Sequence, residues 1–419
     1  MATIFWDPKA TAVAQVDTVE ITAYDVATTY ILTVNGEQVV SLIGQGGTVT
    51  TTAAAAVVLW NASTSPYCTG ITASNASGVI TLTADTAGEP NTVTSSKSGG
   101  TGTIGSVTSV TAATGPNDWN NAVNFSGGAI PANTNDVVVD NTNQSILFGL
   151  DQSGMSGTLN SFTVGAGFTG KIGLNRNKFL TAGAEAAGAG EYREDYLKIE
   201  CDGVISISDD SGTGVTLKSQ RIKIDNGANA ATFRVFSTAD LENSADNPRP
   251  PVQLLSTSAS STLYAKSGFV GVAVAVPGET ATFGTINSAG ARIITGNGLT
   301  LTTFVQSASG GATGAGSSIR AAGTITTMTI NGGTVETSGS FAITTVNCGA
   351  GEFVSNSTGT ITNLNSTGGS CNFIKSKEAR TVTTPLIDAP GSIAYDPSVV
   401  TLTNKVTSNN PVNYSASSV

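Results

Sequence analysis

Residues 323–398 read, in four consecutive segments, GTITTMTINGGTVETSG, SFAITTVNCGAGEFVSNSTG, TITNLNSTGGSCNFIKSKEA and RTVTTPLIDAPGSIAYDPS. Near the start of each segment an aliphatic residue is followed by Thr, at Ile325, Ile343, Ile361 and Val382, so the steps are 18, 18 and 21 residues. Repetition at a short, nearly fixed period is typical of a solenoid, in which stacked repeats bury a continuous core that one repeat could not bury alone. We therefore expect these four residues to form one internal ladder.

Two further apolar positions recur in each segment, on either side of a corner that is mostly rich in Gly or Asn. The first set is Met328, Val346, Leu364 and Leu386, and the second is Val335, Phe353, Phe373 and Ile393. Short Thr- and Val-rich runs separated by such corners indicate strands. The sequence predicts a mainly β protein whose C-terminal part is a β-solenoid (β-helix) with one coil per repeat. Its handedness stays open, and a β-sandwich of evenly spaced strands is the alternative.

The composition of the chain argues against several classes of function. Charged residues make up 11% of the 419 residues, against roughly 25% in an ordinary domain. The formal net charge of −10 argues against a nucleic-acid partner. The chain has no histidine, which excludes a Ser-His-Asp or Cys-His nucleophile. We expect no catalytic residue, cofactor or metal, and hence no enzymatic activity.

The four cysteines, Cys68, Cys201, Cys348 and Cys371, contain no C-x-x-C pair, so a zinc ribbon is not supported. Cys348 and Cys371 occupy different offsets in their repeats and are not expected to stack. We expect four free and mostly buried thiols.

The first residues and the hydropathy of the chain indicate where the protein is located. The first residues, MATIFWDPKATAVAQV, lack the apolar stretch of a secretion signal, and no run of about 18 apolar residues predicts a membrane span. The neutral, hydroxyl-rich composition is nevertheless that of a displayed surface protein. A virion protein, assembled in the host cytoplasm and exposed on release, satisfies both observations.

We divide the chain into an N-terminal arm (1–16), an α+β attachment module (17–112), an irregular β-helical part with insertions (113–275) and regular solenoid coils with a C-terminal tail (276–419). In the arm, Phe5 and Trp6 are candidates for particle attachment, because aromatic side chains dominate interface energetics. The alternative is a frayed terminus.

The second part should be a small α+β sandwich. Residues 17–42 alternate apolar and polar side chains around Asn35-Gly36, a strong hairpin signal. The Ala-rich run 50–61 predicts a helix whose Val57, Val58 and Trp60 can face a sheet. The segment GVITLTADTAGEPNTVTSS (78–96) predicts further strands.

The strings YILTVNGEQV, LWNAS and GVITLTADTAGEPNTVTSS, in that order over about 80 residues, resemble a small structural module of tailed-phage and prophage proteins. A second stretch, GPNDWNNAVNFSGGAIPANTNDVVVD (115–140), is similar to the opening coil of many bacterial and phage surface β-helix proteins. These resemblances imply a structural role and no catalytic residues.

Two clusters of acidic residues are candidates for a glycan-binding or catalytic site. Glu191, Tyr192, Glu194, Asp195 and Tyr196 are glycan-contact candidates. Stacked coils can bring two of these carboxylates, or Glu200 or Asp202, to the spacing that glycosidases use, with the tyrosines as sugar platforms. A solvated acidic loop is the simpler alternative. The adjacent carboxylates Asp209 and Asp210 point to opposite faces of a regular strand and make no acid/base pair.

Two further strings have a plainer reading. The G-x-G-x-x-G string at 165–170 lacks the Ser or Thr and the following helix that a phosphate loop needs, so a solenoid corner is favoured. Residues 140–143 offer oxygen ligands for calcium, or simply form a polar turn.

The sequence thus predicts a non-enzymatic structural protein on a bacteriophage particle, most simply capsid decoration or a head-associated projection. Its expected partners are other virion proteins and two further copies of itself in a homotrimer. The alternative is a tail fibre or tailspike that binds, and in one form degrades, host surface glycan.

Overall fold

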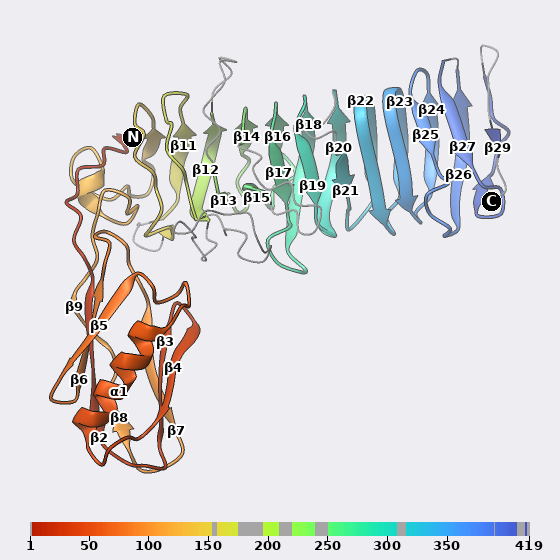
Figure 1. Cartoon of the computed structure of the whole chain (residues 1–419). Helices are drawn as coiled ribbons and strands as arrows, with labels where there is room; N and C mark the ends of the chain where they lie inside the picture. Colours follow the sequence, from red (N-terminus) through yellow and green to blue (C-terminus); the bar gives the residue numbers. More distant parts are fainter. Residues whose placement is uncertain are drawn as a thin grey trace.

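The computed structural model describes residues 2–152, 157–174, 196–208, 220–238, 250–307, 316–388 and 390–408, with the backbone of 415–416. The protein is mainly β, with a β-solenoid of about 10 turns and a small N-terminal module, which confirms the predicted fold class. The solenoid forms a straight rod, and the module hangs from the end where the first strand lies, with the C-terminus at the far end (Figure 1).

The solenoid strands pair in parallel from one coil to the next. They are β1 (Thr3–Phe5), β10 (Asp136–Val139), β11 (Leu159–Val164), β12 (Leu197–Ile207), β13 (Ile222–Asp225), β14 (Thr232–Val235), β15 (Val252–Leu255), β16 (Thr262–Ala265), β17 (Phe269–Val272), β18 (Thr280–Ser288), β19 (Arg292–Thr295), β20 (Gly298–Gln306), β21 (Ser317–Ile319), β22 (Ile325–Gly339), β23 (Ile343–Ser357), β24 (Ile361–Ser366), β25 (Ser370–Asn372), β26 (Arg380–Ile387), β27 (Ser392–Tyr395), β28 (Val400–Leu402) and β29 (Ser415–Ala416).

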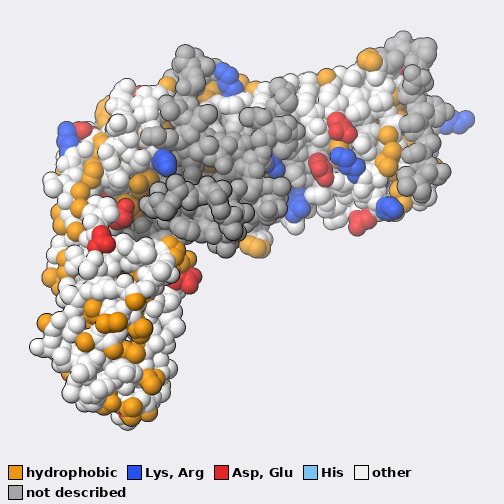
Figure 2. Space-filling view, viewed as in Figure 1, with side chains coloured by type: hydrophobic (Ala, Val, Ile, Leu, Met, Phe, Trp, Pro, Cys, Tyr) orange, Lys and Arg blue, Asp and Glu red, His pale blue; other side chains and the backbone are white. Residues whose placement is uncertain are grey.

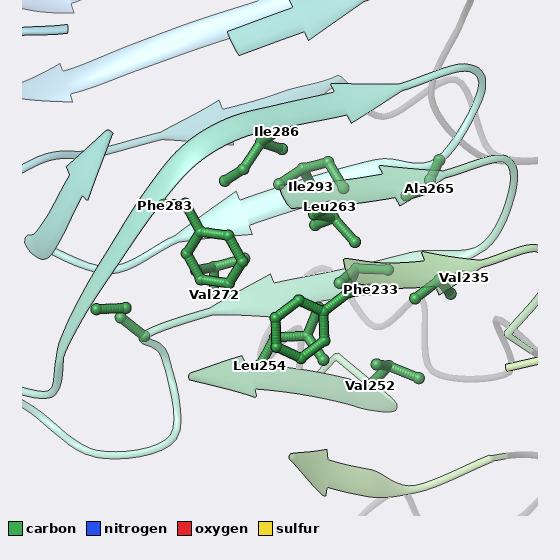
Figure 3. Close-up of a cluster of buried hydrophobic side chains, with 14 of the residues drawn as sticks. Phe233, Val235, Val252, Leu254, Leu263, Ala265, Val272, Phe283, Ile286 and Ile293 are labelled. Carbon is green, nitrogen blue, oxygen red and sulfur yellow. The ribbon is translucent and has the colours of Figure 1, made fainter. Parts of the chain in front are cut away.

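The predicted internal ladder is confirmed. Ile325 pairs with Ile343, Ile343 with Ile361 and Ile361 with Val382, and all four side chains are buried. Apolar side chains from successive strands fill the space between the sheets in the same way further up the rod (Figure 3). Identical or similar residues therefore stack directly above one another along the core.

The other two predicted sets of stacked apolar residues, which begin at Met328 and Val335, need one correction each. Met328, Val346 and Leu364 stack as expected, but Pro385 rather than Leu386 occupies the next rung. In the third set, Cys371 rather than Phe373 lies between Phe353 and Ile393. The displacement from 373 to 371 is two residues, which leaves both side chains on the inner face of a strand. Phe373 is accordingly still buried, edge-on to Phe353 with ring centroids 6.0 Å apart.

The third step of the ladder, from Ile361 to Val382, is longer than the others, and Arg380 holds its extra residues in place. The buried guanidinium of Arg380 donates hydrogen bonds to the backbone carbonyls of Ser355, Ser376 (2.8 Å) and Glu378 (3.0 Å). Its partners thus include a strand of an earlier coil and the extra residues just before β26. Arg380 therefore holds the insertion against the rod, and burial lowers the pKa of its guanidinium.

One outward face carries a column of hydroxyl and amide side chains. None of its members is buried, and successive members are in register: Thr285, Thr303, Thr327, Thr345, Asn363 and Thr384. β-branched side chains suit a pleated surface, and Thr leaves it uncharged. Figure 2 shows the result on the visible side of the rod, where white side chains predominate and charges are sparse.

The N-terminal module consists of two antiparallel sheets and a helix. One sheet contains β2 (Val16–Ala23), β5 (Ile71–Ala76), β6 (Val79–Ala84), β8 (Thr103–Ile104) and β9 (Thr108–Thr111), and the other contains β3 (Thr29–Val34), β4 (Glu37–Ile43) and β7 (Val93–Ser98). The predicted hairpin joins β3 to β4, where Asn35 and Gly36 both have positive φ.

The helix is α1 (Val49–Ala62), and Thr48 caps it by accepting a hydrogen bond from the Thr51 backbone N–H. Its buried face is formed by Thr52, Ala53, Ala56 and Trp60. Trp60 faces the sheet as predicted and donates its indole N–H to Ile71 O at 2.8 Å. Val58, however, is 65% exposed. The spacing from Ala53 to Ala56 to Trp60 follows one helix face, and Val58 lies off that face.

The predicted arm is wrong for residues 3–6, because β1 lies inside the rod. β1 pairs in parallel with β10, so it belongs to the opening coil. On the other side of β1, Phe5 and the residues after it contact residues 124–126, with Ser126 N donating to Phe5 O at 2.8 Å and Asp7 N to Asn124 O at 2.7 Å. The module is therefore inserted between two strands of the solenoid. The same contacts satisfy Phe5 at the outer edge of β1, an edge that could otherwise pair with other chains.

The four cysteines are free and buried, as predicted. Cys348 pairs with Ser366 and Cys371 with Phe353, so the two do not stack in register. No helix in the described ranges is long and apolar enough to cross a membrane.

Trp6 should be the residue that holds the opening coil together. Trp6→Ala removes a buried indole, a change that costs about 3–5 kcal/mol in a packed core. Because solenoids unfold locally rather than in one step, we expect faster amide hydrogen exchange in β10 and β11, with β22 and β23 unchanged. Phe5→Ala is the matched control, because Phe5 is 50% exposed whereas Trp6 is 3% exposed. Equal effects of the two substitutions would contradict the assignment.

Candidate functional site

The two predicted attachment residues have different environments. The Trp6 ring stacks on Trp119 at 5.6 Å between centroids and meets Phe125 edge-on at 5.3 Å. It is a core residue of its own chain, so its predicted role as an anchor on a neighbouring subunit is wrong. Phe5 points away from this cluster and is half exposed. The difference follows from strand alternation, since neighbouring residues face opposite sides.

The opening-coil motif supplies the rest of this cap. Asn124 is fully buried, accepts a hydrogen bond from Ala10 N at 2.9 Å and donates to Gly115 O and Asp118 O, both at 2.9 Å. It thereby joins the segment after β1 to the segment that follows the module, next to the 3-10 turn η1 (Ala122–Asn124). Asn124 belongs to the 115–140 stretch that resembles an opening coil. Its buried position gives that stretch a structural role.

Of the five predicted glycan-contact residues, Glu191, Tyr192, Glu194 and Asp195 lie outside the described residues, as do Asp209 and Asp210. Tyr196 is described, just before β12. Its hydroxyl donates to Pro250 O at 3.1 Å and accepts from Arg221 Nη1 at 3.0 Å. The Arg221 guanidinium also lies 5.2 Å from the centroid of the Tyr196 ring. This tyrosine ties three coils together, and its ring is already in contact with a cation.

A groove of about 410 Å³ lies beside these residues on the outer surface of the irregular coils. Its lining is formed by Asp151, Gln152, Gly157, Lys198, Ile199, Glu200, Lys223 and Asp225. β12 and β13 run in parallel here, with Lys198 opposite Lys223 and Glu200 opposite Asp225. Neighbouring strands lie about 4.8 Å apart. Two cations and two carboxylates are therefore stacked in adjacent rows, in a protein that is otherwise poor in charge.

The two lysines differ in how they are held. Lys223 Nζ lies 2.9 Å from Glu279 Oε1, and both side chains are largely buried. The other oxygen of Glu279 accepts from Ala275 N at 2.8 Å. Lys198 pairs with Asp151 at 3.3 Å, but both side chains are more than half exposed. Lys223 is thus fixed by a desolvated pair, whereas Lys198 and Asp151 are open to solvent and to a ligand.

The groove has the chemistry of a polyol-binding surface. Carboxylates accept and ammonium groups donate hydrogen bonds, and together they match the hydroxyls of a sugar. Within the described ranges no group of three or more Cys, Asp or Glu side chains is placed to hold a metal ion. Of the residues that line this groove, only Glu200 was a candidate from the sequence, although the similar strings KIE (198–200) and KID (223–225) were a usable signal for the others.

The glycine string at 165–170 forms a coil corner after β11, as favoured from the sequence. A Cβ at Gly165 would lie 2.4 Å from the Asp140 carboxyl carbon, so the corner needs glycine for close approach and not for a phosphate. Asp140 and Asn141 form the polar turn of the simpler interpretation, with Asn141 N donating to Asp140 Oδ1 at 2.8 Å.

Comparisons with protein-family models, with curated proteins and with solved structures each found no match for this chain. The resemblance to phage modules therefore stays a prediction from the quoted strings. The class of protein that the fold defines is a β-solenoid with an inserted α+β module.

The two lysines of the groove provide a test of its electrostatics. Lys223→Met leaves the Glu279 carboxylate without its cation in a mostly buried position, and we expect a loss of about 1.5–3 kcal/mol of stability. Lys198→Met removes an exposed pair and should cost about 0–1 kcal/mol. Amide hydrogen exchange in β12 and β13 measures both losses locally. Equal losses, or a larger loss for Lys198→Met, would show that the desolvated pair does not hold this coil.

Proposed function

We propose that the protein is a non-enzymatic structural component displayed on the surface of a bacteriophage particle, as capsid decoration or a head-associated projection. The observation that carries the proposal is the division of the chain into a long, capped, charge-poor rod and a separate module at one end of it (Figures 1 and 2). A rod of stacked coils projects a surface away from its base without needing an active site. Other virion proteins and copies of the chain itself, in a homotrimer, are the proposed partners.

The module supplies the attachment surface in this proposal. Its exposed apolar side chains include Val26, Ile43, Val58 and Leu59, and Figure 2 shows orange patches on the visible side of the module. Contiguous apolar surface of this kind marks interaction sites in soluble proteins. The rod offers mainly Thr, Ser, Asn and Gly, which make weak interface anchors. Attachment through the module replaces the role first given to Trp6.

Incorporation into particles tests this arrangement. The double substitution Val58→Asp/Leu59→Asp places charges on the exposed side of α1 and should reduce incorporation at least tenfold, because two carboxylates would have to be desolvated at the interface. Val276→Asp is the matched control, since Val276 is 57% exposed but lies on the rod. Quantitative mass spectrometry of purified particles gives the ratio. Normal incorporation of the double variant, with loss for Val276→Asp, would place attachment on the rod.

The groove favours a second candidate, a tail fibre or tailspike that binds host surface glycan. Its specific support is the stacked pair Glu200 and Asp225 beside Lys198. At the strand spacing of about 4.8 Å, the two carboxyl groups can accept from neighbouring hydroxyls of one sugar. Catalysis would further require one of them to be protonated at neutral pH.

Calorimetry with oligosaccharides from the host surface tests the second candidate. Glu200→Gln/Asp225→Asn should weaken binding at least tenfold if the carboxylates accept sugar hydroxyls, since each lost charged hydrogen bond is worth about 1.5–3 kcal/mol. Glu37→Gln, an exposed change on the module, should leave binding unchanged. Release of reducing ends by the unmodified chain, abolished in the double variant, would overturn the non-enzymatic assignment.

A further inference from the structure

Cys348 and Cys371 lie in neighbouring coils of the regular solenoid. Cys348 is in β23, in register with Ile330 of the coil before and Ser366 of the coil after. Cys371 is in β25 of that following coil, in register with Phe353 of β23. Both side chains face the interior and belong to the same buried cluster. Two thiols that are 23 positions apart in the sequence are thus brought to the same part of the core.

The packing around Cys348 directs its sulfur toward the other cysteine. Cys348 Sγ lies 3.6 Å from Ser370 O, the carbonyl of the residue that precedes Cys371. A Cβ at Gly369 would lie 2.3 Å from the same sulfur, so only glycine leaves room for it. The interaction between the two thiols lowers the pKa of Cys348 and raises the pKa of Cys371. The other two cysteines lie elsewhere, Cys68 in the module and Cys201 in β12.

We propose that Cys348 and Cys371 are an oxidisable dithiol, and that hydrogen peroxide converts them into a disulfide that joins two adjacent coils of the rod. The geometry favours this because both side chains are buried in neighbouring coils of one core, and the Cys348 sulfur lies against the residue that precedes Cys371, so side-chain rotation can bring the sulfurs to the disulfide geometry. The inference concerns the coils alone and does not depend on the proposed virion location.

The reaction balances without any group beyond the peroxide. The Cys348 thiol loses its proton, and the thiolate attacks one peroxide oxygen and breaks the O–O bond. The departing hydroxide takes up that proton, which gives a sulfenic acid and one water. Cys371 sulfur then attacks the sulfenic sulfur, the S–O bond breaks, and the departing oxygen leaves as a second water with the Cys371 proton. The two sulfurs are oxidised by two electrons in total, and the peroxide is reduced by the same number.

The thiols are unequal in a way that fits these roles. The interaction with Cys371 lowers the pKa of the Cys348 thiol, and the same interaction together with burial raises the pKa of Cys371 well above its usual range. The thiolate is the nucleophile, so Cys348 reacts first and Cys371 resolves. Both sulfurs are buried, which excludes a bulky disulfide such as oxidised glutathione as the oxidant.

Peptide mapping of the full chain tests the proposal. The folded protein is treated with hydrogen peroxide, the remaining thiols are alkylated in denaturant, and the protein is cleaved after glutamate. The sequence places Cys348 in the peptide 337–352 and Cys371 in the peptide 353–378. We expect these peptides to be recovered as one crosslinked species, lighter by two hydrogen atoms than their sum, with Cys68 and Cys201 alkylated.

Variants and a second oxidant make the result decisive. Cys348→Ser and Cys371→Ser should each abolish the crosslink. Ser366, the next residue in the same column as Cys348, already donates to Gly369 O at 2.8 Å, so serine suits this corner and Cys348→Ser should fold. Oxidised glutathione should give at most a tenth of the crosslink formed by peroxide. Sulfinic acid at Cys348 without a crosslink, a crosslink to another cysteine, or no reaction of the folded chain would overturn the proposal.

Discussion

In-register stacking of parallel strands is the constraint on which the rest of the structure depends. Each coil hydrogen-bonds to the coils before and after it, so every inward side chain meets its equivalent one strand away. A stack of this kind favours apolar groups inside and admits a charge only where it finds hydrogen-bond partners, as the buried guanidinium of Arg380 does. The isoleucine ladder of β22, β23 and β24, the corner glycines and the uncharged threonine column all follow from that one geometry.

The same geometry explains how much the sequence reveals. The position of the ladder at Ile325, Ile343 and Ile361 was predictable, because a fixed step leaves a repeating string. Leu386 and Phe373 were predicted in the places that Pro385 and Cys371 occupy, because a local shift of one or two residues breaks the repeating string. The burial of Trp6 was beyond any local pattern, because β1 finds its partner in β10 on the far side of a whole module. The groove depends on two strands whose intervening residues carry no repeat.

The functional argument rests on a contrast between the two parts of the chain. The rod carries few charges and has a groove around β12 and β13. The module has a small separate core and leaves several aliphatic side chains on its surface. In the proposed function the module attaches the protein and the rod displays a surface. The groove is the feature that would add recognition of a ligand to that role.

The insertion of the module between β1 and β10 has a consequence for synthesis on the ribosome. Thr3 is made before the module, yet its partner Asp136 is made only after the module is complete. Domains generally fold as units during translation, with N-terminal ones first. The module can therefore fold while β1 is still unpaired. The opening coil is completed when Trp119 and Phe125 pack against Trp6 and β10 pairs with β1. From there each new coil has a finished template to add to, so the rod grows vectorially in the direction of translation.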